Sequence, residues 1–202
     1  MTELLSPAGP GRRERKKQET RRVIKDAALA LALERGLEHL TVEQITEAAD
    51  VSRRTFFNYF SCKEDALITD CTEIAEQLRQ MVLDRPAEET PLQAVRAALD
   101  ESRLLGEENV RRDRALDRQR LVRDNPSLLP RQLGQFATIE RAFAEAVTQR
   151  LGADPDQDMR PDLVAAVGVS VIRVAMRRWT ERGTPGPDVL VDEAFDLLDS
   201  RV

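Results

Sequence analysis

Residues 41–67 have the pattern of two short helices joined by a tight turn. Thr41 and Gln44 predict the start of the first helix, since their spacing is that of a capping box, in which each side chain accepts from the other residue's backbone N–H. Asp50 predicts the turn, because aspartate tolerates the left-handed backbone conformation better than most residues. Ser52 is then placed to cap a second helix. The N-terminal part of the chain is therefore predicted to be helical.

The second helix of this pair, expected to begin at Arg53, has an apolar and a polar side. Half of the chain's eight aromatic residues fall within residues 56–60, and Phe56 and Phe60 recur at helical spacing, so we expect them to face the first helix. Arg53 and Arg54 are then expected on the exposed side of this helix. Because a guanidinium can donate two hydrogen bonds to guanine in the major groove, the pattern predicts a DNA-reading helix-turn-helix. The alternative is a solvated face with incidental arginines.

Positive charge is concentrated at the start of the chain, although the whole chain has a net charge of −5. Residues 11–25 contain eight Lys or Arg and two Glu, and the first 63 residues together hold 12 basic and 9 acidic residues. The remaining residues hold 19 basic and 27 acidic ones. We therefore expect a DNA-facing N-terminal domain and an acidic body that the phosphates of double-stranded DNA repel. An architectural protein that binds DNA without sequence preference is the alternative, although it would not need so large a body.

Residues 20–67 resemble the N-terminal domain of TetR-family transcriptional regulators. The resemblance rests on short motifs along this stretch: Ala27 and Ala28; Glu34, Arg35 and Gly36; Thr41 and Val42; Val51 and Ser52; Thr55; Phe60; Lys63 and Glu64. The resemblance implies that Arg53, Arg54, Thr55 and Asn58 face bases or nearby phosphates of DNA. It implies that Lys63 contacts a phosphate. The residues expected to bind DNA are Thr20, Thr41, Arg53, Arg54, Thr55, Asn58, Tyr59 and Lys63.

Four positions depart from the pattern of the family. The aromatic hydroxyl that relatives often place on a phosphate falls at Phe57, which has no hydroxyl, and Tyr59, at a frequent histidine position, is expected to take over that contact. The usual turn glycine is Asp50, and a common alanine is Thr46. The base-reading residues vary among such regulators, so the operator sequence does not follow from the resemblance.

The rest of the chain has the pattern of an all-helical protein, because no run of alternating β-branched residues favours a strand. The predicted fold is all-α, with a three-helix helix-turn-helix DNA-binding domain, a larger helical ligand-binding and dimerisation domain, and about nine helices. The expected boundaries are a disordered segment at 1–11, the DNA-binding domain at 12–63 and the larger domain at 64–202. Prolines, which interrupt helices, separate the stretches expected to be helical in the body: 64–84, 91–106, 107–124, 128–151, 160–182 and 188–200.

The C-terminal stretches have the apolar patterns of core or interface helices. Residues 133–151 have one apolar stripe, whereas residues 163–176 are apolar around most of the helix circumference. The last two helices resemble the pair with which TetR-family proteins form a four-helix dimer interface, which implies a homodimer. Its two reading helices would contact two half-sites of a palindrome about 34 Å apart. The alternative is an ordinary core within one chain.

The resemblance also implies that the larger domain senses a hydrophobic effector, whose binding in an apolar cavity releases a repressor from a pseudo-palindromic operator. Residues 111–133, which hold six arginines between 111 and 123 beside leucines, resemble together with residues 177–183 an acyl-CoA-responsive, mycofactocin-regulator-like actinobacterial subgroup. Such arginines can bind an anionic head group. An unrelated hydrophobic effector and plain core packing are the alternatives. The residues expected to bind the ligand are Leu104, Leu121, Leu133, Phe136, Ile139, Phe143, Val169, Ile172, Met176, Trp179, Arg120 and Arg123.

The sequence offers little for catalysis, a metal or a cofactor. The only histidine is His39, and no Cys or His stands at metal-ligand spacing. Neither a nucleophile motif nor a glycine-rich phosphate loop occurs. We therefore expect no enzyme, no metal and no cofactor.

No segment is expected to span a membrane. The longest apolar run, residues 163–176, is shorter than the ~20 residues of a span and contains Arg173. The N-terminus lacks the apolar core of a signal peptide, so we expect a cytoplasmic protein without a membrane partner. Cys62 and Cys71 are predicted to share one helix, too far apart to form a disulfide, and a redox role for Cys62 stays open.

Overall fold

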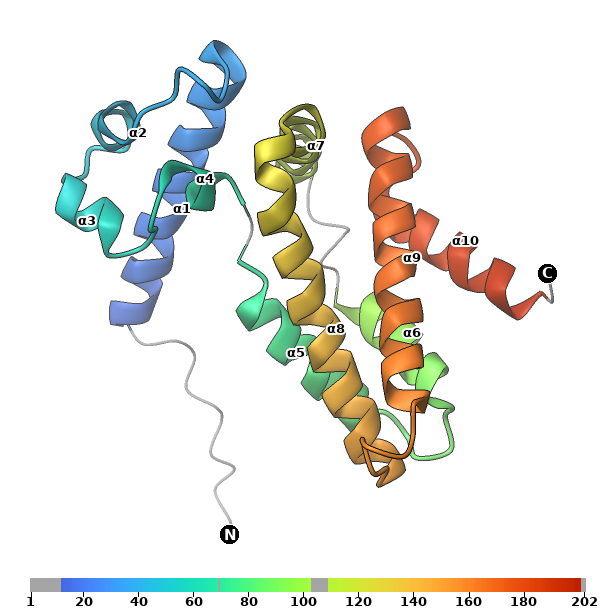
Figure 1. Ribbon diagram of the computed structural model, residues 1–202. Helices are drawn as coiled ribbons and strands as arrows, with labels where there is room; N and C mark the ends of the chain where they lie inside the picture. The colour runs from blue at the N-terminus through green and yellow to red at the C-terminus, as the bar shows by residue number, and fades with distance from the viewer. Residues whose placement is uncertain (1–11, 69, 103–108, 201–202) are drawn as a thin grey trace, which may run out of the picture. The chain divides into compact units, whose positions relative to one another are not determined.

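The computed structural model describes residues 12–68, 70–102 and 109–200. Within these ranges the chain forms ten α-helices and one 3₁₀ turn (Figure 1), which confirms the predicted all-α class. The chain divides into two compact units between Leu67 and Ile68. The segment 1–11 and Leu104 lie outside the described residues. None of the described helices has the combination of length and hydropathy that crossing a membrane requires.

The first unit consists of four helices. They are α1 (Arg12–Arg35), α2 (Val42–Ala48), α3 (Arg53–Phe57) and α4 (Lys63–Leu67). α1 packs against α2 and α4, and α2 packs against α3. The core between them contains Ile24, Ala28, Ile45, Phe56 and Leu67, all fully buried. The short helices α2 and α3 are thus held by burial against the long α1 rather than by their own length.

The second unit consists of six helices and a short turn. They are α5 (Thr72–Asp84), α6 (Pro91–Glu101), α7 (Asn109–Asp124), η1 (Pro126–Leu128), α8 (Leu129–Leu151), α9 (Arg160–Arg182) and α10 (Pro187–Asp199). α8 packs along both α5 and α9, and α9 also contacts α6, α7 and α10 (Figure 1). The two long helices α8 and α9 therefore form the centre of this unit.

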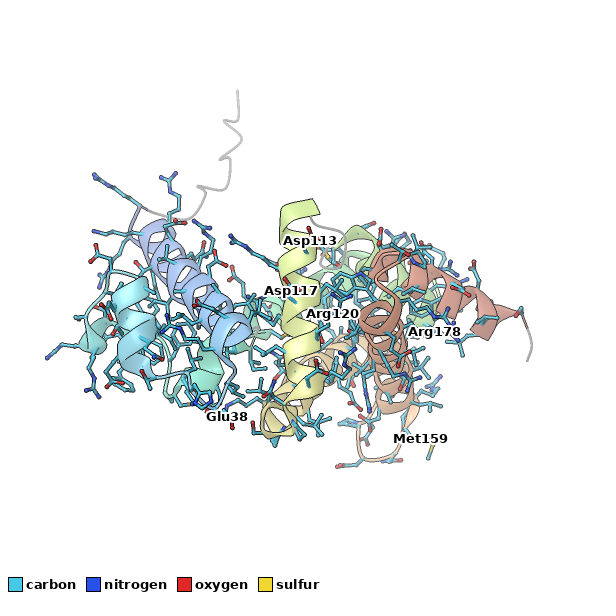
Figure 2. The ribbon with its side chains drawn as sticks, turned by 90° about the horizontal axis from the view of Figure 1, so that it is seen from above. Glu38, Asp113, Asp117, Arg120, Met159 and Arg178 are labelled. Carbon is cyan, nitrogen blue, oxygen red and sulfur yellow. The ribbon has the colours of Figure 1, made fainter. Side chains whose placement is uncertain are left out.

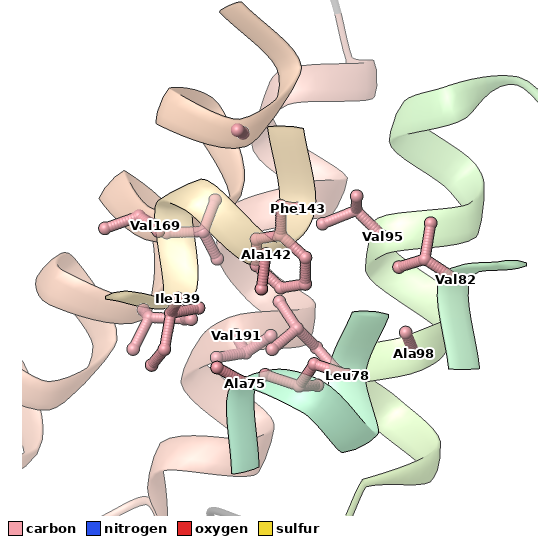
Figure 3. Close-up of a cluster of buried hydrophobic side chains, with 14 of the residues drawn as sticks. Ala75, Leu78, Val82, Val95, Ala98, Ile139, Ala142, Phe143, Val169 and Val191 are labelled. Atoms are coloured by element: carbon pink, nitrogen blue, oxygen red, sulfur yellow. The ribbon is translucent and has the colours of Figure 1, made fainter. Parts of the chain in front are cut away.

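The core of the second unit is densely filled where α6, α8 and α9 meet (Figure 3). Phe143 of α8 and Val95 of α6 are fully buried, and Val169 of α9 belongs to the same cluster. Gly168 allows α9 to approach this closely, because a Cβ atom at this position would lie 2.8 Å from Val95 Cγ1. Carbon atoms do not pack at that distance, so the junction requires glycine.

The prediction of a single helix over residues 64–84 is wrong, because the structure has two helices there, α4 and α5. Asp70 accounts for the new start, since its Oδ1 accepts from the N–H of Thr72 at 2.9 Å. Cys62 therefore precedes α4, whereas Cys71 is the N-cap residue of α5. The prediction that these cysteines share a helix is also wrong, although they form no disulfide, as expected.

A cluster of ion pairs connects α6 to α10. The guanidinium of Arg96 lies 2.7 Å from Asp196 Oδ1 and 3.4 Å from Asp199 Oδ2. It also lies 3.9 Å from Asp192 Oδ1 and over the ring of Phe195, 5.7 Å from the ring centroid. The hydrogen bond to Asp196 raises the pKa of Arg96 above its ordinary value. Charge and packing together thus hold α10 against α6.

Asp100 adds an unfavourable carboxylate to this cluster. Partial burial and the nearby carboxylate of Asp192, to which it is hydrogen-bonded, raise the pKa of Asp100 from 3.8 to about 6. A carboxyl whose pKa is higher in the folded than in the unfolded chain stabilises the fold while it is protonated. This contribution is fully present below pH 3.8 and is lost as the pH rises through about 6.

We therefore expect Asp100→Asn to raise the free energy of unfolding at neutral pH by ~1 kcal/mol, a modest value because Asp100 stays partly in contact with water. It should also remove much of the loss of stability that we expect of the wild type between about pH 4 and about pH 6. Urea unfolding across this range measures both effects. Asp156→Asn, in the exposed loop between α8 and α9, is the control and should keep the wild-type profile. The same pH profile in Asp100→Asn would contradict the prediction.

Candidate nucleic-acid interface and ligand pocket

The segment from α2 to α3 has the caps that its sequence predicts. The N–H of Gln44 donates to Thr41 Oγ1 at 3.2 Å, and the N–H of Thr41 donates to Gln44 Oε1 at 2.9 Å, so the capping box is present. Asp50 lies in the left-handed region, with a φ of 50°. Ser52 Oγ accepts from the N–H of Thr55 at 3.0 Å and caps α3. Local hydrogen bonds thus set where the turn ends and α3 begins.

α3 and the residues after it present a buried and an exposed side. Phe56 and Phe60 are buried with their ring centroids 5.5 Å apart, and the guanidinium of Arg21 lies 5.7 Å from the centroid of the Phe60 ring. Arg53 and Arg54 are exposed in the first turn of α3. The aromatic residues therefore anchor α3, and its arginines face solvent.

The other residues expected near DNA differ in exposure. Asn58, the C-cap residue of α3, is exposed, and the side chain of Phe57 beside it is 49% exposed. Thr55 is half-buried, and its hydroxyl lies 2.8 Å from Ser52 Oγ. Tyr59 is also half-buried. The exposed ring of Phe57 can offer apolar contact to the methyl group of a thymine.

The two arginines of α3 have different surroundings. Arg53 Nη1 lies 2.9 Å from Glu43 Oε1 of α2, and both side chains are well exposed. Arg54 forms no ion pair with any residue in the described ranges. Binding of Arg53 to a base or phosphate would have to replace its contact with Glu43, whereas Arg54 needs no such exchange.

Three further residues expected at the DNA donate or accept hydrogen bonds within the unit itself. Lys63 Nζ donates to the carbonyls of Leu37 and Leu40, and the hydroxyl of Thr20 donates to the carbonyl of Lys16 at 3.0 Å. The hydroxyl of Thr41 is occupied by the capping box. Their contacts with DNA stay predictions.

The N-terminal turns of α1 have exposed basic side chains. Five of them lie within the first six residues of the helix: Arg12, Arg13, Arg15, Lys16 and Lys17. Positive charge of this kind attracts the phosphate backbone of DNA without reading its sequence.

A half-open pocket of about 660 Å³ lies between α7, η1, α8 and α9. Its size falls in the range typical of small-molecule sites. Its apolar wall comes mainly from η1 and the start of α8, and its polar groups come from α7 and α9 and from Gln132 of α8. The lining residues are Gln119, Val122, Arg123, Pro126, Leu129, Gln132, Leu133, Phe136, Ser170, Arg173, Val174, Met176, Arg177, Thr180 and Glu181.

The structure brings only part of the expected ligand site together at this pocket. Four expected residues line it: Arg123, Leu133, Phe136 and Met176. Arg120 of α7 (Figure 2) is not among the lining residues. The others are buried in the interior and are not among the lining residues either: Leu121, Ile139, Phe143, Val169, Ile172 and Trp179.

Three arginines, Arg123, Arg173 and Arg177, line the pocket. The guanidinium of Arg173 lies over the ring of Phe136, 5.8 Å from its centroid. Neither Arg173 nor Arg177 forms an ion pair within the part of the chain that the structure describes. Arg123 is 2.7 Å from Asp124, and this hydrogen bond holds the pKa of Asp124 below its usual range. The pocket thus combines an apolar wall with arginines that can bind an anion.

Of the residues that α9 contributes to this pocket, only Met176 was predicted from the sequence, and the polar ones were missed. Ser170, Arg173, Arg177 and Glu181 recur at three- and four-residue steps and line one side of it. That polar stripe was the available signal. It begins inside the run 163–176, whose apolar residues suggested burial on more than one side of the helix.

Two family models match the chain. Residues 24–68 match bacterial regulatory proteins of the tetR family, and residues 89–202 match the MftR C-terminal domain. The chain is 38% identical over 199 residues to the HTH-type transcriptional regulator TcmR of Streptomyces glaucescens, which covers 96% of this chain and 88% of that protein. The chain belongs to the TetR family. TetR-family proteins are DNA-binding transcriptional regulators rather than enzymes, and the expected helix-turn-helix is confirmed.

A second TetR-family relative supports the expected subgroup. The chain is 28% identical over 185 residues to a protein of Mycobacterium tuberculosis named as the mycofactocin biosynthesis transcriptional regulator MftR, with 91% of each chain covered. Together with the match to the MftR C-terminal domain, this confirms the predicted likeness to mycofactocin regulators.

Solved structures of two repressors share the fold. NalD, the secondary repressor of the MexAB-OprM multidrug efflux pump of Pseudomonas aeruginosa, has a TM-score of 0.61 at 21% identity, with 91% of this chain and 96% of that chain covered. FadR of Thermus thermophilus in complex with lauroyl-CoA has a TM-score of 0.50 at 22% identity, with 88% and 92% covered. At such identities the likeness concerns the fold alone.

Proposed function

We propose that this TetR-family regulator is a ligand-released repressor that binds a pseudo-palindromic operator as a homodimer in the cytoplasm. Residues 12–63 would read the DNA, and residues 64–202 would bind the ligand and form the dimer. The observation that carries the proposal is that one chain joins an α3 with outward arginines to a second unit with an apolar, arginine-rimmed pocket. The proposal assigns the protein no catalytic activity.

Exposed apolar side chains on α9 and α10 support the dimer. Leu163 of α9 and Val189, Leu197 and Leu198 of α10 are all at least half exposed. These helices pack against each other, and leaving several large apolar side chains on them in water is unfavourable. A second copy of the same two helices, related by a two-fold axis, would cover them and would present two α3 helices to two half-sites.

The chemistry of the pocket supports an amphipathic anion as the effector, with a long-chain acyl-CoA as our candidate. Leu129, Leu133 and Phe136 offer an apolar surface for an acyl chain, and Arg173 and Arg177 offer hydrogen-bond donors for phosphates. Binding would weaken the affinity for the operator by a coupling free energy of ~1–3 kcal/mol. A regulator that senses an unrelated hydrophobic molecule is the alternative.

The test is binding of the purified protein to the intergenic DNA upstream of its own gene, in the presence of excess unrelated DNA. We expect a preference of ~10³-fold or more for the operator, followed by release when oleoyl-CoA is added. Specific binding that oleoyl-CoA does not affect would support a sequence-specific regulator but would exclude long-chain acyl-CoA as its effector. An absence of sequence preference would contradict the proposal and favour an architectural DNA-binding protein.

Matched variants test whether the effector binds in this pocket. Combined replacement of Arg173 and Arg177 by methionine should raise the oleoyl-CoA concentration needed for release by about tenfold or more, because two donors to the anion are lost. Arg141→Met, at an exposed position of α8 outside the pocket lining, should behave as wild type. Equal release in all three proteins would place the effector elsewhere.

A further inference from the structure

The ammonium of Lys63 bonds backbone carbonyls far away in the sequence. Lys63 Nζ donates to the carbonyl of Leu37 at 2.9 Å and to that of Leu40 at 2.7 Å. Both carbonyls belong to the connection between α1 and α2, whereas Lys63 begins α4. One side chain therefore joins the connection before α2 to the helix that follows α3.

The connection that Lys63 contacts has few other hydrogen bonds. The side chains of Leu37 and Leu40 are buried, and the carbonyl of Leu37 also accepts from the N–H of Leu40, at a longer distance of 3.3 Å. Gly36, just before it, ends α1 with a φ of 83°. Backbone carbonyls in such a partly buried connection need partners, and those that follow a helix C-terminus favour a cation.

The position of Lys63 in its own helix is electrostatically unfavourable, since the N-terminal end of a helix repels positive charge. Glu64 and Asp65 follow it and have the sign that this end prefers. Asp65 Oδ2 accepts from the N–H of Ser61 at 3.2 Å, so a neighbouring carboxylate already bonds the backbone before α4. The hydrogen bonds of Lys63 to the α1–α2 connection, and not stabilisation of α4, account for a lysine at this position.

We propose that Lys63 is a positioning residue of the DNA-binding unit. By holding the carbonyls of Leu37 and Leu40, it fixes the connection that leads into Thr41, the N-cap residue of α2. α2 sets the place of α3 through the turn at Asp50. Lys63 therefore acts on DNA through α2 and α3.

Hydrogen exchange of the full-length protein without DNA tests this role, because a phosphate contact would leave the free protein unchanged. In Lys63→Met we expect the amides of residues 37–44 to exchange about ten- to hundredfold faster than in the wild type, the effect of losing hydrogen bonds to a charged group. The second unit should exchange as before. Arg54→Met is the matched control, since it removes an exposed cation from the same unit and should leave this exchange unchanged.

Lys63→Gln is the second variant, because it is neutral but keeps an N–H donor beside the carbonyls. Positioning predicts exchange between that of the wild type and that of Lys63→Met. Loss of the fold of the first unit in Lys63→Met, with the second unit intact, would also support positioning. Wild-type exchange in both variants, together with a salt dependence of DNA binding reduced by about one ion per Lys63, would overturn the proposal in favour of a phosphate contact.

Discussion

Replacing Arg54 with methionine is expected to remove most of the sequence preference of the protein while leaving its binding to unrelated DNA nearly unchanged. Arg54 is exposed in the first turn of α3 and is not held by an ion pair in the described part of the chain. An arginine that donates two bonds to guanine contributes about 1–3 kcal/mol of discrimination, and the proposed dimer presents it twice. The affinity for the operator should therefore fall by a factor of about 30 or more.

Competition binding with operator and unrelated DNA measures this change. Arg13→Met is the control, because Arg13 is exposed in the first turn of α1 and is expected to contact phosphates only. It should weaken binding to both DNAs alike and reduce the salt dependence. A full preference for the operator in Arg54→Met would show that another side chain reads the bases.

The second large effect is expected in the stability of the second unit. Arg150, near the end of α8, donates to four backbone carbonyls at the end of α5 and in the loop after it: those of Val82 at 3.0 Å, Arg85 at 2.7 Å, Pro86 at 2.7 Å and Glu89 at 3.4 Å. Arg150→Met removes the guanidinium from all four carbonyls, of which those of Val82, Arg85 and Glu89 are in partly buried bonds. We expect the free energy of unfolding to fall by ~3 kcal/mol, since each bond to a charged donor contributes ~1.5–3 kcal/mol and water replaces some of them.

Urea unfolding of the full-length protein, followed in the second unit, measures the loss. Arg141→Met in the same helix is the control, because Arg141 is exposed, and its effect should stay within ~0.5 kcal/mol. Arg150→Lys should recover only part of the stability, because an ammonium has fewer donors than the guanidinium fork. A loss below ~1 kcal/mol in Arg150→Met would mean that water satisfies these carbonyls equally well.

The parts of the fold that depend on neighbouring residues could be predicted from the sequence. The capping box of Thr41, the left-handed turn at Asp50 and the cap at Ser52 are decided by contacts within a few residues, and the structure confirms each of them. The start of α9 was predictable for a similar reason, since Pro161 fits the first turn of a helix and fits its interior poorly.

Contacts between distant parts of the chain could not be predicted in this way. The apolar ligand residues proposed from the sequence were chosen by apolar periodicity, which does not distinguish a filled core from a cavity wall. Phe143 and Val169 are packed into the core, and Gly168 brings α9 close to Val95 of α6. The carbonyl partners of Lys63 and Arg150 lie 23 to 68 residues away, and no local pattern signals such pairs.

Trp179 is the only tryptophan of the chain. It is 2% exposed on α9, and its Nε1 has no hydrogen-bond partner in the described part of the chain. Met176 and Thr180, its neighbours on the same helix, both line the pocket. Indole emission depends on local polarity, so a ligand that enters the pocket should change the fluorescence of this one residue. Because the DNA-binding unit contains no indole, the intrinsic emission of the unmodified protein provides an optical signal that belongs to the effector side of the proposed switch alone.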